Sequence, residues 1–241
     1  ARCKKHLAFF MQKKQKGNTA MGGRGANSGD LGGGNASSLN SEKAGDIWNY
    51  RHNENNEQFV DNINQTVREM AESYDGLMNT INDIYMAKVK DNPTVMAFWD
   101  IDHGELGINT RYGNIEKMAS AYDDCVKKGY HPGRGNKTAE QAVIAHELGH
   151  SLTSVAMQKM RSNNFDDVSK KIMKEAQNIL NKGLKKKKYP GTRKIATKIS
   201  EYATSSNAEC IAEATADVYC NGSKAKAESK AVVQALKGFM K

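Results

Sequence analysis

Apolar side chains recur at three- and four-residue steps between about residues 55 and 90. They are Phe59, Ile63, Val67, Met70, Tyr74, Leu77, Ile81, Ile84 and Tyr85. Because this spacing places them on one side of an α-helix, it predicts one long or two shorter amphipathic helices. The next segment, 93–101, is mostly apolar and predicts a strand. A turn around 102–105 and a second strand over 106–112 would complete a β-hairpin.

Helical periodicity dominates the remainder of the chain. It predicts a helix over 115–128, then one that begins after Thr138, whose side chain would form a capping box with Gln141. Further helices are expected at about 164–182, 198–220 and 224–240, with a lysine-rich loop around Pro190. These elements predict an α+β fold, mostly helical, with a small mixed or antiparallel sheet.

Glycine is concentrated near the beginning of the chain. Eight of the 21 glycines fall between Gly17 and Gly34, a composition that does not form a packed core. We therefore expect a flexible, basic, glycine-rich arm over 1–44 and one globular domain over 45–241.

The net charge of +9 raises the question of a nucleic-acid partner. The lysines concentrate in the arm and in the run Lys185–Lys188, without the interleaved aromatic residues of a base-stacking surface. Solvated charge is the favoured interpretation, and nucleic-acid binding is an unsupported alternative. The four cysteines have no metal-ligand spacing and should be reduced and mostly buried. No stretch has the length of a membrane-spanning helix, so we expect a soluble protein without a membrane partner.

The motif His146-Glu147-Leu148-Gly149-His150 carries the strongest chemical signal. On a helix, His146 and His150 project from the same face and can bind one Zn²⁺ at about 2.0–2.1 Å each. Glu147 is then placed to reach a metal-bound water, as general base and later general acid. The flanking residues are apolar, so the histidines should be buried, where they need partners.

A catalytic zinc also needs a third protein ligand and an open position for water. The third histidine of the longer pattern HExxHxxGxxH, six residues after the motif, is absent, because residue 156 is alanine. His103 and His131 lie in expected loops, and either one could in principle reach the site.

The better candidate for the third ligand lies downstream. Glu209, Glu213 and Asp217 repeat every four residues along a helix whose other residues are nearly all small or apolar. Buried carboxylates require a cation or hydrogen-bond partners, so we expect Glu209 to bind the metal. Glu213, one turn on, is placed to accept the free ring N–H of a ligating histidine. Asp217 could be a further support or a surface charge.

At these two segments the chain resembles the gluzincin metallopeptidases related to the catalytic domain of anthrax lethal factor. The family signature is HExGH followed by YxxxNxxEFFAEAF, and the matching segments here are 146–150 and 202–214. Similar domains occur in phage and mobile-element zinc peptidases of Gram-positive bacteria. The glycine-rich segment 22–29 is also similar to segments of phage minor-head-associated proteins.

The resemblance implies a zincin-like fold and zinc-dependent peptide hydrolysis, with Glu209 as third ligand and Glu213 in support. It further implies that Tyr202 points its hydroxyl at the metal, and we expect Asn207, one residue after the asparagine position of the signature, to cap the helix carrying Glu209. The chain departs from the signature just after Glu209, where the two aromatic positions are Cys210 and Ile211. This departure affects the expected substrate specificity more than the expected metal binding.

Zincins also bind an extended peptide along an edge strand beside the active-site helix. Leu106–Tyr112, with Gly107 and Ile108, is the candidate here, although an ordinary strand of the sheet is an equally good interpretation. The expected function is that of a zinc endopeptidase acting on a peptide or protein, in the bacterial cytoplasm or associated with phage. The alternative is a phage- or mobile-element-derived structural or interaction protein that keeps the fold without significant turnover.

Overall fold

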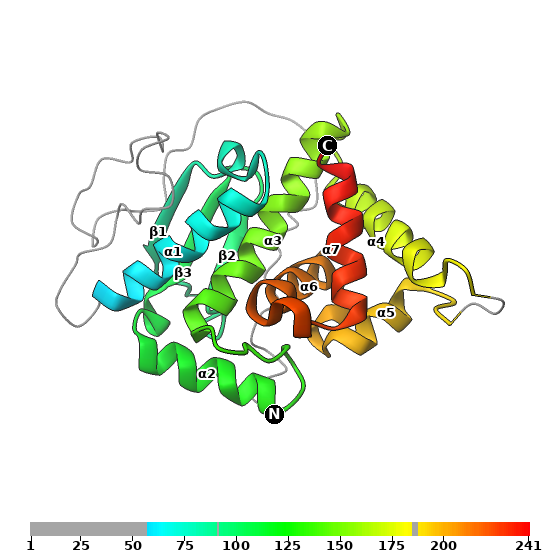
Figure 1. The fold of residues 1–241 in the computed structure, drawn as a ribbon. Helices are drawn as coiled ribbons and strands as arrows, with labels where there is room; N and C mark the ends of the chain where they lie inside the picture. The colour runs from blue at the N-terminus through cyan, green and yellow to red at the C-terminus, as the bar shows by residue number, and fades with distance from the viewer. Residues whose placement is uncertain (1–56, 91, 185–187) are drawn as a thin grey trace.

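The computed structural model describes residues 57–90, 92–184 and 188–241 (Figure 1). The expected arm over 1–44 and Cys3 lie outside the described residues. Within the described ranges, Cys125, Cys210 and Cys220 are reduced cysteines, and the first two are buried. No helix in these ranges combines the length and apolar character needed to cross a bilayer.

The first part of the described chain forms a three-stranded sheet flanked by helices. Helix α1 (Glu57–Ser73) and a 3₁₀ turn (Leu77–Thr80) lead into β1 (Asp83–Ala87), β2 (Ala97–Asp100) and β3 (Glu105–Asn109). A 3₁₀ turn (Thr110–Tyr112) and helix α2 (Ile115–Lys127) follow. The strand order is β1-β3-β2, with β1 parallel and β2 antiparallel to β3. The sheet is therefore mixed.

The second part is helical. It comprises α3 (Ala139–Lys159), α4 (Phe165–Asn181), α5 (Thr192–Ile199), α6 (Asn207–Asn221) and α7 (Ala227–Phe239), with 3₁₀ turns at Tyr202–Thr204 and Gly222–Lys224. The α+β class, mostly helical with a small sheet, is thus confirmed.

Helix α3 lies in the middle of the molecule (Figure 1). It contacts α1 and β2 on one side and α6, α4 and α7 on the other, and all its residues from Ala139 to Ala156 are buried. The predicted capping box is present: the Gln141 backbone N–H donates to Thr138 Oγ1, and the Gln141 side chain accepts from the Thr138 N–H. A helix surrounded on every face can hold polar side chains only where they meet partners.

The prediction of one long or two shorter helices over 55–90 is wrong in its second half, because α1 ends at Ser73 and residues 83–87 form a strand. Gly76 adopts a left-handed conformation (φ 84°), which suits glycine and turns the chain. Beyond it the burial pattern alternates, with Ile84 and Met86 buried and Tyr85 between them half-buried. This period of two belongs to a strand with one covered face.

The prediction that Leu106–Tyr112 is an edge strand is also wrong. Strand β3 is the central strand, so Gly107 and Ile108 have backbone neighbours on both sides. Gly107 lies between Tyr85 of β1 and Phe98 of β2. A Cβ atom at Gly107 would lie 2.2 Å from the Phe98 ring, so this glycine leaves room for an aromatic ring across the strands. The edges of the sheet are β1 and β2.

The single helix expected over 198–220 is interrupted. Helix α5 ends at Ile199, Ser200 is extended, and α6 begins at Asn207. The expected cap, Asn207, is the first helical residue, and the N-cap is Ser206, whose Oγ accepts the Glu209 N–H at 3.0 Å. Because Ser206 precedes Glu209 by three residues, its hydroxyl reaches the N3 amide, as an N-cap requires. This cap fixes where α6 begins relative to Glu209.

Candidate metal centre

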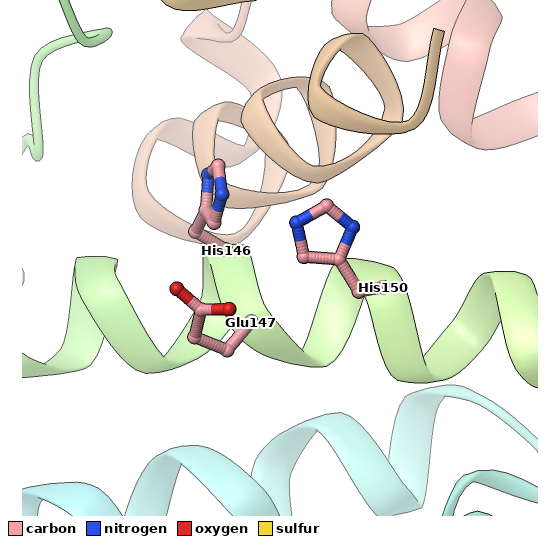
Figure 2. Close-up of side chains that lie close together, drawn as sticks. All are labelled: His146, Glu147 and His150. Carbon is pink, nitrogen blue, oxygen red and sulfur yellow. The ribbon is translucent and has the colours of Figure 1, made fainter. Parts of the chain in front are cut away.

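Four polar side chains meet where α3 and α6 pack against each other. Figure 2 shows His146 and His150 rising from α3 toward α6, with Glu147 beside them on the same helix. From α6, Glu209 Oε2 lies 3.2 Å from His146 Nε2 and 3.5 Å from His150 Nε2. The structure therefore brings together the three residues that the sequence assigns to the metal.

The distances fit a zinc tripod. Tetrahedral ligands at about 2.0–2.2 Å from zinc lie about 3.3–3.6 Å from one another, close to the two separations observed here. Glu209 Oε2 is buried and has no hydrogen-bond partner among the described residues. An orphaned carboxylate oxygen facing two imidazole nitrogens is the donor set that a divalent cation would satisfy.

Glu147 could compete with Glu209 as the third ligand. Ligand-type atoms of His146, Glu147 and His150 all lie within 4.8 Å of one another. Glu209 Oε2 lies 3.2 and 3.5 Å from the two Nε2 atoms, which suits a ligand that shares one ion with both histidines, so we assign the ligand position to Glu209. Glu147 then lies beside the metal position, where a base for a bound water is needed.

Glu213 holds the far side of His146. Its Oε1 accepts from His146 Nδ1 at 2.8 Å and from His131 Nδ1 at 2.9 Å, while Oε2 accepts from Ser200 Oγ at 2.6 Å. Since a carboxylate accepts only, His146 donates to Glu213 through Nδ1, so the neutral form of its ring would carry the proton on Nδ1 and the lone pair on Nε2, the nitrogen that faces Glu209. This is the tautomer that binds a metal through Nε2.

Tyr202 lies on the 3₁₀ turn between α5 and α6 and is only 1% exposed. Its ring stacks on His146 at a centroid distance of 5.8 Å and lies tilted against the Tyr130 ring at 5.2 Å. Burial raises the pKa of its hydroxyl far above the ordinary value, and the negative charges of Glu209 and Glu147 raise it further. The phenol is therefore protonated and available as a hydrogen-bond donor beside the carboxylates.

The buried carboxylates of Glu147, Glu209 and Glu213 determine the protonation of the side chains in this site. Burial raises the pKa of Glu147, and the charges of Glu209 and Glu213 raise it further against the opposing histidines. Burial alone would also raise the pKa of Glu209, but the nearby His150 and His146 hold it at about 2. In the described ranges, the ion pairs of Glu209 and Glu213 are all with histidines. Burial lowers the pKa of His146, yet its contacts with the carboxylates of Glu209 and Glu213 raise it well above the ordinary value.

The two other histidines that the sequence offered as ligands lie elsewhere. His103 is exposed at the β2–β3 turn, where Nδ1 contacts Asp100 Oδ2 at 2.9 Å. His131 is buried, but its Nδ1 contacts Glu213 instead of joining the tripod. Its ring stacks on Tyr122, with a centroid distance of 5.4 Å and an interplanar angle of 3°. Nothing in the sequence around His131 signals this position behind a ligand.

Asp217, which the sequence left open, is neither part of the metal cluster nor a surface charge. Its Oδ2 accepts the Lys226 backbone N–H at 3.0 Å, and Oδ1 accepts from the Asn221 side chain at 2.9 Å. It therefore connects the end of α6 to the start of α7, and the acidic stripe of α6 divides between two tasks.

Gly149 lets the two helices approach closely. A Cβ atom at this position would lie 2.7 Å from Ala212 Cα and 3.2 Å from the Thr215 side chain of α6. Any larger residue would push α6 away from α3. The short separations between Glu209 and the two histidines thus depend on the glycine within the motif.

A separate groove of about 1130 Å³ lies between α4 and α7, and none of the tripod residues line it.

Comparison with protein-family models, curated proteins and solved structures finds no match for this chain. The side chains of the site are therefore what indicates a function.

Proposed function

We propose that this chain is a zinc-dependent endopeptidase of the gluzincin type with a zincin-like domain, similar to the peptidases related to anthrax lethal factor. The observation that carries the proposal is the position of Glu209 Oε2, 3.2 and 3.5 Å from the Nε2 atoms of His146 and His150. Its substrate would be a peptide or protein.

The residues divide the chemistry among them. His146, His150 and Glu209 would hold the zinc, which when bound activates a water and polarises the scissile carbonyl. Glu147, whose pKa is raised by burial, would take the proton from that water and deliver it to the leaving amine. Tyr202, held as a neutral phenol, would donate a hydrogen bond to the oxyanion.

The sheet limits where an extended substrate could add as a strand. Because β3 is paired on both sides, only β1 and β2 have an unpaired edge within the described sheet. Of these, β2 (Ala97–Asp100) contacts α3, the helix that carries the motif. We therefore assign substrate pairing to β2, in place of the candidate strand Leu106–Tyr112 that the sequence offered.

Metal analysis of the wild type, Glu209→Ala and Glu147→Gln tests the assignment of roles. The wild type should bind a single zinc ion, Glu209→Ala should lose it, and Glu147→Gln should keep it. Glu69→Ala, which removes a half-exposed carboxylate, is the matched control and should retain the metal. Full zinc retention in Glu209→Ala would rule out the ligand set.

Turnover separates the peptidase from the alternative, a structural or interaction protein that keeps the fold. Cleavage of a peptide library by the zinc-loaded wild type should fall about 10²–10⁴-fold in Glu147→Gln, since that substitution removes the general base. Equal cleavage by both proteins would exclude this mechanism. A zinc-loaded wild type that cleaves nothing in the library would favour the alternative.

A further inference from the structure

We propose that His131 is a positioning residue for His146, acting through the Glu213 carboxylate that the two imidazoles share. This inference rests on the proposed zinc site and extends it to a loop outside both motif helices. His131 lies between α2 and α3, fifteen positions before His146 and far from Glu213 in the sequence.

The shared carboxylate has all its donors inside the protein. Glu213 Oε1 accepts from His131 Nδ1 at 2.9 Å and His146 Nδ1 at 2.8 Å, and Oε2 accepts from Ser200 at 2.6 Å. His131 and Glu213 are 4% and 1% exposed. With three donors arriving from three segments, the carboxylate cannot rotate without losing a hydrogen bond, so His146 keeps one ring orientation.

The imidazole of His131 has no other polar task within the described structure. Its Nε2 is buried without a hydrogen-bond partner among the described residues. Burying a bare ring nitrogen costs free energy, which a purely apolar ring at the same place would avoid. The one polar contact that this histidine makes there is the one to Glu213, and that contact accounts for a histidine at this position.

The loop carrying His131 is itself fixed to the segment that carries Ser200 and Tyr202. The Glu201 N–H donates to Gly129 O at 2.9 Å, and the Tyr202 N–H donates to Tyr130 O at 3.1 Å. On the other side, the ring is held between Tyr122, stacked at 5.4 Å, and Tyr202, edge-on at 5.5 Å. The donor nitrogen of His131 is therefore aimed by backbone and ring contacts together.

Two substitutions separate hydrogen bonding from packing. His131→Phe keeps a ring for Tyr122 to stack on but removes the donor. His131→Asn loses the ring but keeps an N–H in the place of Nδ1. If His131 works through Glu213, the Phe variant should lose zinc affinity by about 10–100-fold, the usual cost of losing such a partner, and the Asn variant should recover most of it.

Zinc affinity is measured on the full chain by competition with a chromophoric chelator, with His103→Ala as the exposed-histidine control. Thermal unfolding with chelator present checks that each variant folds. Wild-type affinity in His131→Phe, or an Asn variant at least as weak as the Phe variant, would overturn the positioning role. If the wild type itself binds no zinc, the proposed function fails instead, so the two failures are distinct.

Discussion

Helix α6 contributes to two carboxylate clusters that are built differently. On its buried side, Glu209 and Glu213 are paired with histidines. On another side, the Tyr219 hydroxyl donates to Glu69 at 2.6 Å. The Glu69 side chain is 36% exposed and forms an ion pair with Lys137 at 2.7 Å. A lysine carries three donors and no lone pair, whereas a neutral imidazole can donate at one nitrogen and bind a metal at the other. The type of basic side chain that meets the carboxylate, lysine or histidine, therefore distinguishes a structural ion pair from a candidate metal centre.

Removing one carboxylate from each cluster gives the largest expected contrast. Glu213→Leu leaves three buried donors without their acceptor and should destabilise the protein by about 3–5 kcal/mol. Glu69→Leu breaks a half-exposed pair and should cost about 0–1 kcal/mol. Urea unfolding in the presence of a chelator measures both. Similar losses for the two variants would mean that the clusters do not differ as described.

The close approach of α3 and α6 gives an intermediate effect. Gly149→Ala places a methyl group 2.7 Å from Ala212 Cα, so stability should fall by about 1–3 kcal/mol and zinc affinity with it. Gly238→Ala, in α7 with nothing within 4 Å of the added Cβ, is the matched control. It should gain about 0.5–1 kcal/mol from helix propensity. Unchanged zinc affinity in Gly149→Ala would contradict the dependence of the tripod on this glycine.

The smallest effect is expected at a second half-exposed pair, Asp123 with Arg134. The Arg134 guanidinium donates to both Asp123 oxygens, at 2.8 and 2.9 Å, and holds the pKa of the carboxyl below its ordinary 3.8. A carboxyl whose pKa is lowered on folding stabilises the protein above its unfolded pKa and loses that contribution as the pH falls through the folded pKa. After discounting for solvent screening, Asp123→Asn should cost less than about 1 kcal/mol at pH 7.

Urea unfolding at several pH values checks the direction of that effect. The difference between wild type and Asp123→Asn should shrink as the pH is lowered below about 4. A difference that grows on acidification would contradict the pairing.

The residues of the tripod could be found from the sequence because each signal is local to one helix. The four-residue spacing of His146 and His150 fixes a common face, and Glu209 stands out as an acid among small and apolar neighbours. His131 could not be assigned in the same way. Its contact with Glu213 depends on two backbone hydrogen bonds between loop segments, 129–130 and 201–202, which leave no periodic pattern.

The wrong predictions about the fold also concern features that depend on contacts between distant segments. Ile81, Ile84 and Tyr85 continue the spacing of α1, so the sequence predicts a helix where β1 lies. The residues form a strand because they pair with β3. Whether a strand is central or at an edge depends on its neighbours and not on its own pattern. The position of β3 within the sheet could therefore not be assigned from the sequence. The break before α6 does have a local signal, Ser206 three residues before Glu209, which the apolar pattern on either side obscured.

Glu209 and the two motif histidines come from parts of the chain about sixty residues apart, with α4 and α5 between them. Under the proposed function, bound zinc would act as a cross-link that closes this long loop and restricts the unfolded chain. Its loss should then appear first as local opening of α6 from α3, visible as faster amide hydrogen exchange in α6. Zinc supply would in that case govern the lifetime of the folded protein as well as its chemistry.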